Sequence, residues 1–592
     1  MNTNAEIPRK EYPRPQFFRP GWQTLNGQWS CVFDQTDSGR DNKFFEARGF
    51  EKIINVPFAP ESKLSGIGYT DFINGIWYHR KIAIPADWQG KEVMLHFGGV
   101  NYNCIVYMDG REIASHTGGS SPFSVNITAF ADNAEHDLVV YARNDVRGGL
   151  QASGKQSPWV KSRACNYTRT TGIWQSVWME AVDKYALSYC RIVPDFDNDS
   201  FGFFPEFYNL QSNMTLTVTV QANKQTVAAK TVKAANGIAV TVEVPAPRAW
   251  SPEDPFLYDI IYEVQDCSGK LLDRVESYAG LRKIHLENGR FHLNNQPIFL
   301  RLVLDQGFYE DGIWTAPDDE AIKKDILLVQ AAGFNGARLH QKVFDERFHY
   351  HADRLGYLTW GEFPDWGISF WEVFRKCNPD YMRALRNYYA EWATVVKRDL
   401  NHPSIICWVP FNETRDMYDW AEHCRFIADI YNLTRQLDPT RPVNDTSGYT
   451  HVNTDIWSLH CYHQDGASLA AVLAEKPVNC FFPDKELPAW NGQPIVIDEY
   501  GGISYLPPER KPYADNTWGY NKETLSQEET QNKIIELTRV LVNAENCAGY
   551  CYTQFTDIEQ EQNGIYNYDR TEKFDMQVIQ ECFSAKPEWS KY

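Results

Sequence analysis

The feature that most constrains the fold is a change of rhythm near residue 283, where short apolar strands begin to alternate with amphipathic helices. Residues 298–303 are predicted to form a strand. Residues 318–331 are predicted to form a helix, with acidic residues in its first turn and Gly333 just past its end. A strand, a helix and a strand follow at 334–338, 345–355 and 356–360. Such repeated units predict a TIM barrel over residues 283–592.

The chain before this point is predicted to be β-structure. Residues 1–181 contain β-type segments, a hairpin signal at Asp109-Gly110 and no long helical pattern, which favours a jelly-roll sandwich. Residues 182–282 alternate apolar and polar side chains at 214–220 and 238–244 and have the size of an immunoglobulin-like sandwich. The predicted class is therefore a multidomain protein with two β domains and one α/β domain.

Composition excludes several kinds of protein. The chain of 592 residues is 43% hydrophobic and 14% aromatic, as in ordered globular proteins. Its formal charge of −19 argues against a nucleic-acid partner, because such proteins carry a basic surface. No run approaches the roughly 20 apolar residues of a membrane span, and residues 1–16 lack the apolar core of a secretory signal. The 13 cysteines show no C-x₂-C spacing, so a cytoplasmic location is expected.

Two apolar, β-branched runs each end on a glutamate. Residues 401–413 end at Glu413, and residues 494–500 carry Glu499 next to their end. In a TIM barrel the carboxyl ends of the strands form the active face. Two carboxyl groups on different strands are the groups that a glycosidase uses to break a sugar linkage. For one glutamate alone, a salt-bridged or solvated strand end is the better interpretation, but the pair favours catalysis.

Several motifs resemble those of glycoside hydrolase family 2, and together they cover nearly the whole chain. Residues 398–404, running on to Asn412-Glu413, resemble the family's most specific motif. The other segments that carry the resemblance are 22–29, 75–80 and 172–178 in the first domain, and 250–253, 257–258 and 280–282 in the second. The resemblance implies a jelly-roll, an immunoglobulin-like domain and a TIM barrel. It also implies a homo-oligomer and no cofactor.

The same resemblance implies roles for five residues. Glu413 is expected to be the general acid/base and Glu499 the nucleophile of a retaining exo-β-glycosidase. The pKa of Glu413 is expected to be raised by burial and by the charge of Glu499. Arg338 and Tyr462 match residues that support the nucleophile, and Asn412 matches one that contacts the sugar 2-hydroxyl. The alternatives are an ion pair for Arg338, a pocket-lining aromatic for Tyr462 and a turn residue for Asn412.

Further polar and aromatic residues follow other predicted strands. Each is either a group that binds the sugar or an ordinary loop side chain, and His340 is alternatively a buried, hydrogen-bonded histidine. Trp518 follows the nucleophile and is expected either to stack on the aglycone or to belong to a lid. These candidates are Asp305, Gln306, His340, Glu362, Trp366, Trp518 and Gln554.

Departures from the family pattern bear on the sugar and on metals. The lac-type β-galactosidases carry a magnesium cluster of the form E-x-H after the third strand, but here Glu362 is followed by Phe363 and Pro364. No metal site is therefore predicted. The β-glucuronidases carry an Asn-x-Lys motif after the last strand, whereas this chain has Glu561-Gln562-Asn563-Gly564. The predicted activity is therefore a β-galactosidase.

Other functions stay open beside this one. A β-glycuronidase, acting on glucuronides or galacturonides, is the main alternative, because Arg338, Lys342 or Lys511 would supply a cation for the sugar carboxylate. Another family 2 β-glycosidase is a further alternative. A non-catalytic carbohydrate-binding protein is disfavoured by the presence of both glutamates. The sequence contains no G-x-S-x-G, H-E-x-x-H or P-loop pattern that would suggest a different hydrolase.

Overall fold

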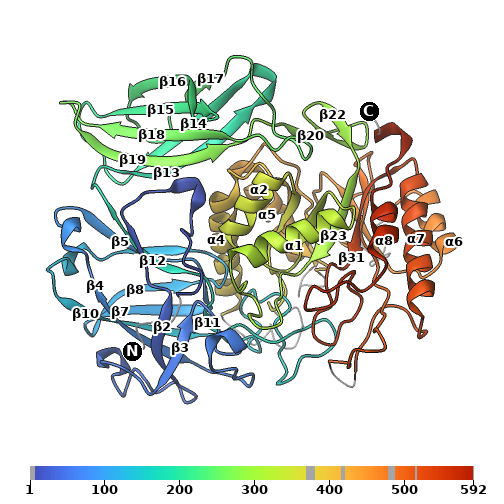
Figure 1. Ribbon diagram of the computed structural model, residues 1–592, viewed down its shortest axis with the longest axis horizontal. Coiled ribbons are helices and arrows are strands. Elements are labelled where there is room, and N and C mark those ends of the chain that lie inside the picture. Colours follow the sequence, from blue (N-terminus) through green and yellow to red (C-terminus); the bar gives the residue numbers. More distant parts are fainter. Residues whose placement is uncertain (1–6, 369–379, 415–419, 478–486, 514–515, 591–592) are drawn as a thin grey trace.

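The computed structural model describes residues 7–368, 380–414, 420–477, 487–513 and 516–590. These residues form three domains, with the first sandwich beside the barrel and the second sandwich lying across both (Figure 1). The three-domain class predicted from the sequence is confirmed.

The first domain is a sandwich of two antiparallel sheets. One sheet has the order β3 (Lys52–Val56), β2 (Gly27–Phe33), β4 (Ile76–Ala83), β10 (Glu135–Arg143), β7 (Asn103–Met108), β8 (Arg111–Thr117). The other has the order β1 (Trp22–Thr24), β12 (Val177–Val182), β5 (Glu92–Phe97), β9 (Phe123–Asn126), and β6 (Val100–Asn101) pairs with β11 (Gly172–Ile173). Asp109 and Gly110 join β7 to β8 with positive φ angles of 49° and 78°, as the hairpin signal predicts.

The second domain is a smaller sandwich. One sheet has the order β13 (Leu187–Asp195), β14 (Ser200–Phe207), β17 (Val240–Glu243). The other has the order β16 (Gln225–Lys233), β15 (Thr215–Ala222), β18 (Tyr258–Gln265), β19 (Leu271–Ala279). Alternation along β15 buries Leu216, Val218 and Val220 between the sheets, while the threonines between them face outward. The period-2 pattern seen in the sequence therefore produces a two-sided strand with one apolar face. A short sheet of β20 (Ile284–Glu287), β21 (Arg290–Leu293) and β22 (Gln296–Ile298) leads into the barrel.

The third domain is a barrel of parallel strands. Seven of them have the order β26 (Ile405–Val409), β25 (Leu358–Glu362), β24 (Gly336–Leu339), β23 (Leu300–Asp305), β31 (Cys547–Thr553), β30 (Ile495–Gly501), β29 (Trp457–Cys461). The short strands β27 (Phe411–Asn412) and β28 (Thr446–Ser447) pair with each other, and Trp408 of β26 bridges to Val443. Ser458 of β29 accepts a hydrogen bond from the backbone N–H of Gly448, which closes the circle.

Helices cover the outside of the barrel. They are α1 (Asp319–Ala331), α2 (Glu346–Leu355), α4 (Tyr381–Asp399), α5 (Trp420–Leu437), α6 (Gly466–Ala474), α7 (Gln527–Asn543) and α8 (Met576–Phe583). The predicted helices at 318–331 and 345–355 are α1 and α2, and Asp318 and Asp345 are their N-caps. Residues 448–456, all of which are described, contain no helix between β28 and β29. One strand–helix unit of the ideal barrel is therefore incomplete.

A loop of the first domain reaches the carboxyl end of the barrel. The backbone N–H of Ser153 donates to the carbonyl oxygen of Trp366 at 2.7 Å, and the N–H of Gly154 donates to that of Pro364 at 3.1 Å. The Tyr167 hydroxyl donates to Glu561, which follows β31. The catalytic face of the barrel is therefore bordered by residues from the first domain.

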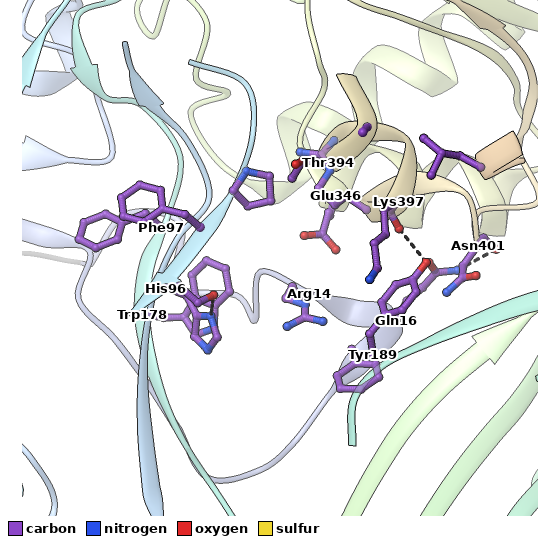
Figure 2. Close-up of a pocket in the computed structure, with 17 residues that line it drawn as sticks. Arg14, Gln16, His96, Phe97, Trp178, Tyr189, Glu346, Thr394, Lys397 and Asn401 are labelled. Carbon is purple, nitrogen blue, oxygen red and sulfur yellow. Dashed lines mark hydrogen bonds between the residues drawn. The ribbon is translucent and has the colours of Figure 1, made fainter. Parts of the chain in front are cut away.

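A cavity of about 380 Å³ lies where the three domains meet (Figure 2). Figure 2 shows Arg14 projecting into it between the aromatic wall of the first sandwich and Glu346 of α2. The Tyr189 hydroxyl of the second domain donates to the carbonyl oxygen of Lys397 in α4 at 2.8 Å and ties these domains together. This cavity contains neither Glu413 nor Glu499, so it is not the candidate active site.

Two sequence expectations concern membranes and disulfides. Among the residues that the structure describes, no helix is long and apolar enough to cross a membrane. The cysteines that fall within the described ranges are all free thiols, and most of them are buried.

Candidate active site

The two predicted catalytic glutamates meet at the carboxyl end of the barrel. Glu413 follows β27 and Glu499 lies in β30. One carboxylate oxygen from each lies within 4.8 Å of the other and of a ring nitrogen of His460. This spacing agrees with the roughly 5–5.5 Å between the two carboxyl groups of retaining glycosidases, and an inverting enzyme needs about 6.5–9.5 Å.

The backbone at Glu413 has an unusual conformation. Its φ of +47° lies in the left-handed region, which costs residues with a side chain about 1–3 kcal/mol and therefore needs support from the surrounding structure. The N–H of Glu413 donates to the carbonyl oxygen of Ser447 at 2.9 Å, which holds this conformation. The structure therefore fixes the direction in which the Glu413 side chain enters the site.

Arg338 and Tyr462 hold the Glu499 carboxylate. Arg338 Nη1 donates to Oε1 at 2.9 Å, and the Tyr462 hydroxyl donates to Oε2 at 2.5 Å. Burial opposes ionisation of Glu499, but the charges of His460 and Arg338 outweigh it, so the pKa of Glu499 is lowered. Glu499 is therefore ionised at neutral pH, as a nucleophile requires.

Arg338 also organises the residues around it. It is fully buried, and it donates to Glu362 Oε2 at 2.6 Å and to Asn412 Oδ1 at 2.5 Å. Because the oxygen of Asn412 is used in this way, its NH₂ group is the part left to meet a ligand. His340 Nδ1 lies 2.9 Å from Glu362 Oε1. Burial, with the charges of Lys155 and Arg338, lowers the pKa of His340 well below the usual range, so the ring is neutral.

Glu362 stands where the lac-type enzymes begin their magnesium cluster. Its Oε2 accepts from Arg338, and its Oε1 lies 2.9 Å from His340 and 3.0 Å from the backbone N–H of Gln341. The adjacent guanidinium would repel a divalent cation. These residues therefore do not fit a magnesium ion.

His460 contacts the acid/base residue directly, which the sequence analysis did not predict. Its Nδ1 lies 2.7 Å from Glu413 Oε1 and 3.5 Å from Glu499 Oε2. Burial disfavours the charged ring, but the carboxylates of Glu499, Asp498 and Glu413 raise the pKa of His460. Burial likewise opposes ionisation of Glu413, but the hydrogen bond and charge of His460 lower its pKa to about 2.

The prediction of a raised pKa for Glu413 was therefore wrong for the ligand-free protein. Burial acts in the predicted direction, but the neighbouring imidazolium outweighs it. Because the pKa of His460 is raised and that of Glu413 is lowered, a proton shared by the pair is favoured on His460 Nδ1, which lies 2.7 Å from Glu413 Oε1. This hydrogen bond gives the proton a direct path to the carboxyl group.

Replacing His460 with glutamine is expected to move the alkaline limb of the kcat/KM profile to lower pH. In the wild type, the shared proton is lost only as pH rises through the raised pKa of His460. In the variant the proton belongs to the Glu413 carboxyl, and carboxyl groups ordinarily titrate about two pH units below imidazole. The measurement is kcat/KM against pH for both proteins, and an alkaline limb that does not move would contradict the role of His460.

The remaining predicted residues lie at different distances from the glutamates. Trp366 lines a cavity of about 770 Å³ together with Glu413, and its Nε1 donates to the carbonyl oxygen of Asn412 at 3.0 Å. Trp518 is half-buried, bonds to the carbonyl oxygen of Ala164, and packs edge-on against Tyr520. Tyr520 in turn stacks on Tyr462. Trp518 therefore supports Tyr462 through the ring of Tyr520.

Asp305 and Gln554 are not placed against the catalytic pair. Asp305 is buried and accepts from the N–H of Gly307, and burial with the charge of Asp325 raises its pKa to about 6. Gln554 accepts from Gln306 and donates to Asn563, so these neighbours occupy its amide group. Both residues serve the packing at the ends of β23 and β31.

His460 and Lys155 were not predicted as site residues, and they differ in whether the sequence carries a signal for them. His460 lies two residues before Tyr462, so the two-residue period of a strand places both on one face. Lys155 lies in the first domain, and no local pattern connects it to the barrel. The position of His460 could therefore have been inferred from the sequence, whereas the position of Lys155 depends on how the domains pack.

Comparisons with known proteins agree with this geometry. The chain matches the TIM barrel domain of glycosyl hydrolases family 2 over residues 284–585, a further family 2 domain over 191–282, and the family's sugar binding domain over 22–180.

The individual relatives have low sequence identity to this chain but align with most of its length. A β-glucuronidase of Paenibacillus borealis is 24% identical over 85% of this chain and 87% of its own. A β-galactosidase of Thermoanaerobacter pseudethanolicus is 25% identical over 71% of this chain and 55% of its own. The solved structure of a Ruminococcus gnavus β-glucuronidase in complex with D-glucaro 1,5-lactone superposes with a TM-score of 0.79 at 19% identity, covering 98% of this chain and all of that one. With the barrel, the two sandwiches and the paired glutamates in place, the chain belongs to glycosyl hydrolases family 2.

Proposed function

We propose that this family 2 glycosidase is a retaining exo-β-glycuronidase, which removes a terminal glucuronic or galacturonic acid. The observation that carries the retaining mechanism is the carboxylate pair, Glu413 and Glu499, with oxygens within 4.8 Å. The uronide specificity is supported by relatives of similar length that are named β-glucuronidase. The β-galactosidase expected from the sequence therefore has less support than its alternative.

In the proposed mechanism each glutamate has one role in each step. Glu499 attacks the anomeric carbon as the bond to the leaving oxygen breaks, and Glu413 gives that oxygen a proton. The sugar is then held as an ester of Glu499. Water next attacks the same carbon while Glu413 takes its proton, and Glu499 leaves as a carboxylate. Two inversions at one carbon give net retention.

The neighbours of the pair support both steps. Arg338 and Tyr462 hold the attacking carboxylate by one oxygen each and keep it ionised. His460 supplies the proton to Glu413 in the first step and stabilises the carboxylate again after the sugar has left. The free NH₂ group of Asn412 is placed for the sugar 2-hydroxyl, a hydrogen bond that strengthens in the transition state.

β-Galactosidase activity is the second candidate, because two observations favour a neutral sugar. One relative is named β-galactosidase. In addition, Glu561 follows β31 at the place of the Asn-x-Lys motif, is buried, and accepts hydrogen bonds from Tyr167 and Asn563. A carboxylate at this place repels a sugar that also carries one.

A panel of nitrophenyl glycosides tests the proposal. It contains the β-glucuronide, β-galacturonide, β-galactoside, β-glucoside, β-mannoside and β-fucoside, together with the α-L-arabinopyranoside. We expect kcat/KM on one uronide to exceed that on the matching neutral sugar by about 10²-fold or more, because a charge pair discriminates strongly. Proton NMR of the first product should show the β-anomer. A higher value on the galactoside would favour the second candidate, and inactivity on every substrate would favour a binding protein.

A further inference from the structure

Lys155 is a buried cation without a partner. It is 7% exposed, and its Nζ makes no hydrogen bond or salt bridge with any residue in the described ranges. Nζ lies 5.4 Å from the centroid of the Trp366 ring, which is a cation–π contact. Nζ has no acceptor among the described residues and is not closed off from solvent, so its N–H donors are open to a ligand.

The backbone around Lys155 is fixed at the mouth of the barrel. Its own carbonyl oxygen accepts from the N–H of Tyr167 at 2.8 Å, and the N–H groups of Ser153 and Gly154 donate to the loop after β25. The residues on either side of Lys155, Gly154 and Gln156, line the cavity of about 770 Å³ that also contains Glu413. Lys155 does not line this cavity itself, but its ammonium group contacts Trp366, which lines the cavity together with Glu413.

The charge of Lys155 affects the pKa values of residues on several sides of the site. It contributes to lowering the pKa of Glu413, after β27, and of His340, after β24. It also opposes the rise in the pKa of Glu561, after β31. These three residues stand on different parts of the barrel rim. Together with the contact to Trp366, this places the charge of Lys155 near the carboxyl end of the barrel.

The other cations that the sequence suggested are already engaged or outside the site. Arg338 uses its donors on Glu362, Glu499 and Asn412. Lys342 donates to the carbonyl oxygens of Gly307 and Trp314 at 2.6 and 2.7 Å, and burial lowers its pKa to about 7. Lys511 is exposed to solvent. Among these candidates, Lys155 is the one that is largely buried and has no hydrogen-bond acceptor in the described residues.

We propose that Lys155 binds the carboxylate of the uronic acid and sets the preference for charged over neutral sugars. This inference rests on the proposed glycuronidase function. It places the specificity group on a loop of the first domain, whereas the barrel segment Glu561-Gln562-Asn563-Gly564 offers no lysine. An ammonium with free donors and low exposure forms a strong charge-assisted hydrogen bond with a carboxylate.

A purely electrostatic role beside Glu561 is the competing explanation. No ion pair joins Lys155 to Glu561 among the described residues, and Glu561 takes its hydrogen bonds from Tyr167 and Asn563 instead. If Lys155 only balanced that charge, its loss would leave the Glu561 carboxylate to repel the uronide, and this selective loss would disappear in a Glu561→Gln background. If it binds the sugar carboxylate, its loss would affect only the charged substrate and would persist in that background.

The test compares Lys155→Gln and Lys155→Arg with the wild type on two matched substrate pairs. These are nitrophenyl β-glucuronide with β-glucoside, and β-galacturonide with β-galactoside, which differ only in carboxylate against hydroxymethyl. Lys155→Gln should lower kcat/KM on the uronide about 10²-fold or more and change that on the neutral partner less than about threefold. Lys155→Arg should recover part of the uronide activity, because it restores the charge. Lys161→Gln, an exposed lysine of the same loop, is the matched control and should behave as the wild type.

Each other outcome overturns the inference and identifies what failed. Equal losses on both members of a pair would show that Lys155 serves catalysis or folding, and unchanged activity would show that it has no role. Wild-type activity restricted to neutral sugars would overturn the proposed function and this inference together. A competition assay on the wild type, with free glucuronate and galacturonate against glucose and galactose, needs no variant. Weaker inhibition by the acids would also count against Lys155.

Discussion

Replacing Glu499 with glutamine is expected to lower kcat at least about 10⁴-fold on every aryl glycoside, which corresponds to about 5.5 kcal/mol of activation free energy. The amide is nearly the same size as the carboxylate but cannot form the glycosyl ester. The neighbouring Glu362 is not available to replace it, because its carboxylate is bound by Arg338 and His340. Steady-state kinetics with a dinitrophenyl glycoside measures the loss.

The loss must be separated from unfolding. Arg338 keeps its hydrogen bonds to Glu362 and Asn412 in the variant, so the site should stay assembled. Glu545→Gln is the matched control, because this exposed glutamate precedes β31 at the opposite end of the barrel. Its kcat and the melting temperatures of both variants should remain near the wild-type values. Near-native turnover by Glu499→Gln would show that the nucleophile has been misassigned.

Elements with strong local signals could be predicted from the sequence. A helix was predicted over residues 318–331 from its acidic first turn and from Gly333 past its end, and the structure has α1 at Asp319–Ala331 with Asp318 as its N-cap. Glu413 and Glu499 were found because buried parallel strands read as apolar runs, and their carboxyl ends meet at one face. In both cases the local chemistry and the global fold agree.

Features that depend on long-range packing could not be predicted in this way. No helix forms between β28 and β29, where the Asp445 carboxylate accepts hydrogen bonds from the backbone N–H groups of Val452 and Asn453. The periodicity of the sequence does not predict this. Lys155 and Glu413 are brought together by a loop that crosses between domains. The lowered pKa of Glu413 needs His460, which lies on another strand. The approach of Glu413 and Glu499 could be predicted from the sequence, but the charges that shift their pKa values could not.

Replacing Glu413 with alanine should lower the activity on substrates with poor leaving groups much more than on substrates with good ones. Without a general acid, a poor leaving group must depart as an alkoxide, and the rate should fall by about 10³–10⁴-fold. A dinitrophenolate needs no proton, so formation of the glycosyl ester on Glu499 should stay within about tenfold of the wild type. The measurement is kcat/KM across aryl glycosides of graded phenol pKa, where the variant should show a much steeper dependence. A uniform loss across the series would mean that Glu413 does not protonate the leaving oxygen.

Azide then distinguishes the second role of Glu413. Hydrolysis of the ester needs Glu413 to take a proton from water, whereas azide attacks without a base and fits the space that the removed side chain leaves. Added azide should therefore raise kcat of Glu413→Ala on the dinitrophenyl substrate by at least about tenfold, and the product should be the β-glycosyl azide. The same azide concentration should leave the wild type unchanged, because its Glu413 carboxylate repels the anion. An α-azide product would instead place the nucleophile at 413 and reverse the two assignments, so the stereochemistry of one product tests both glutamates together.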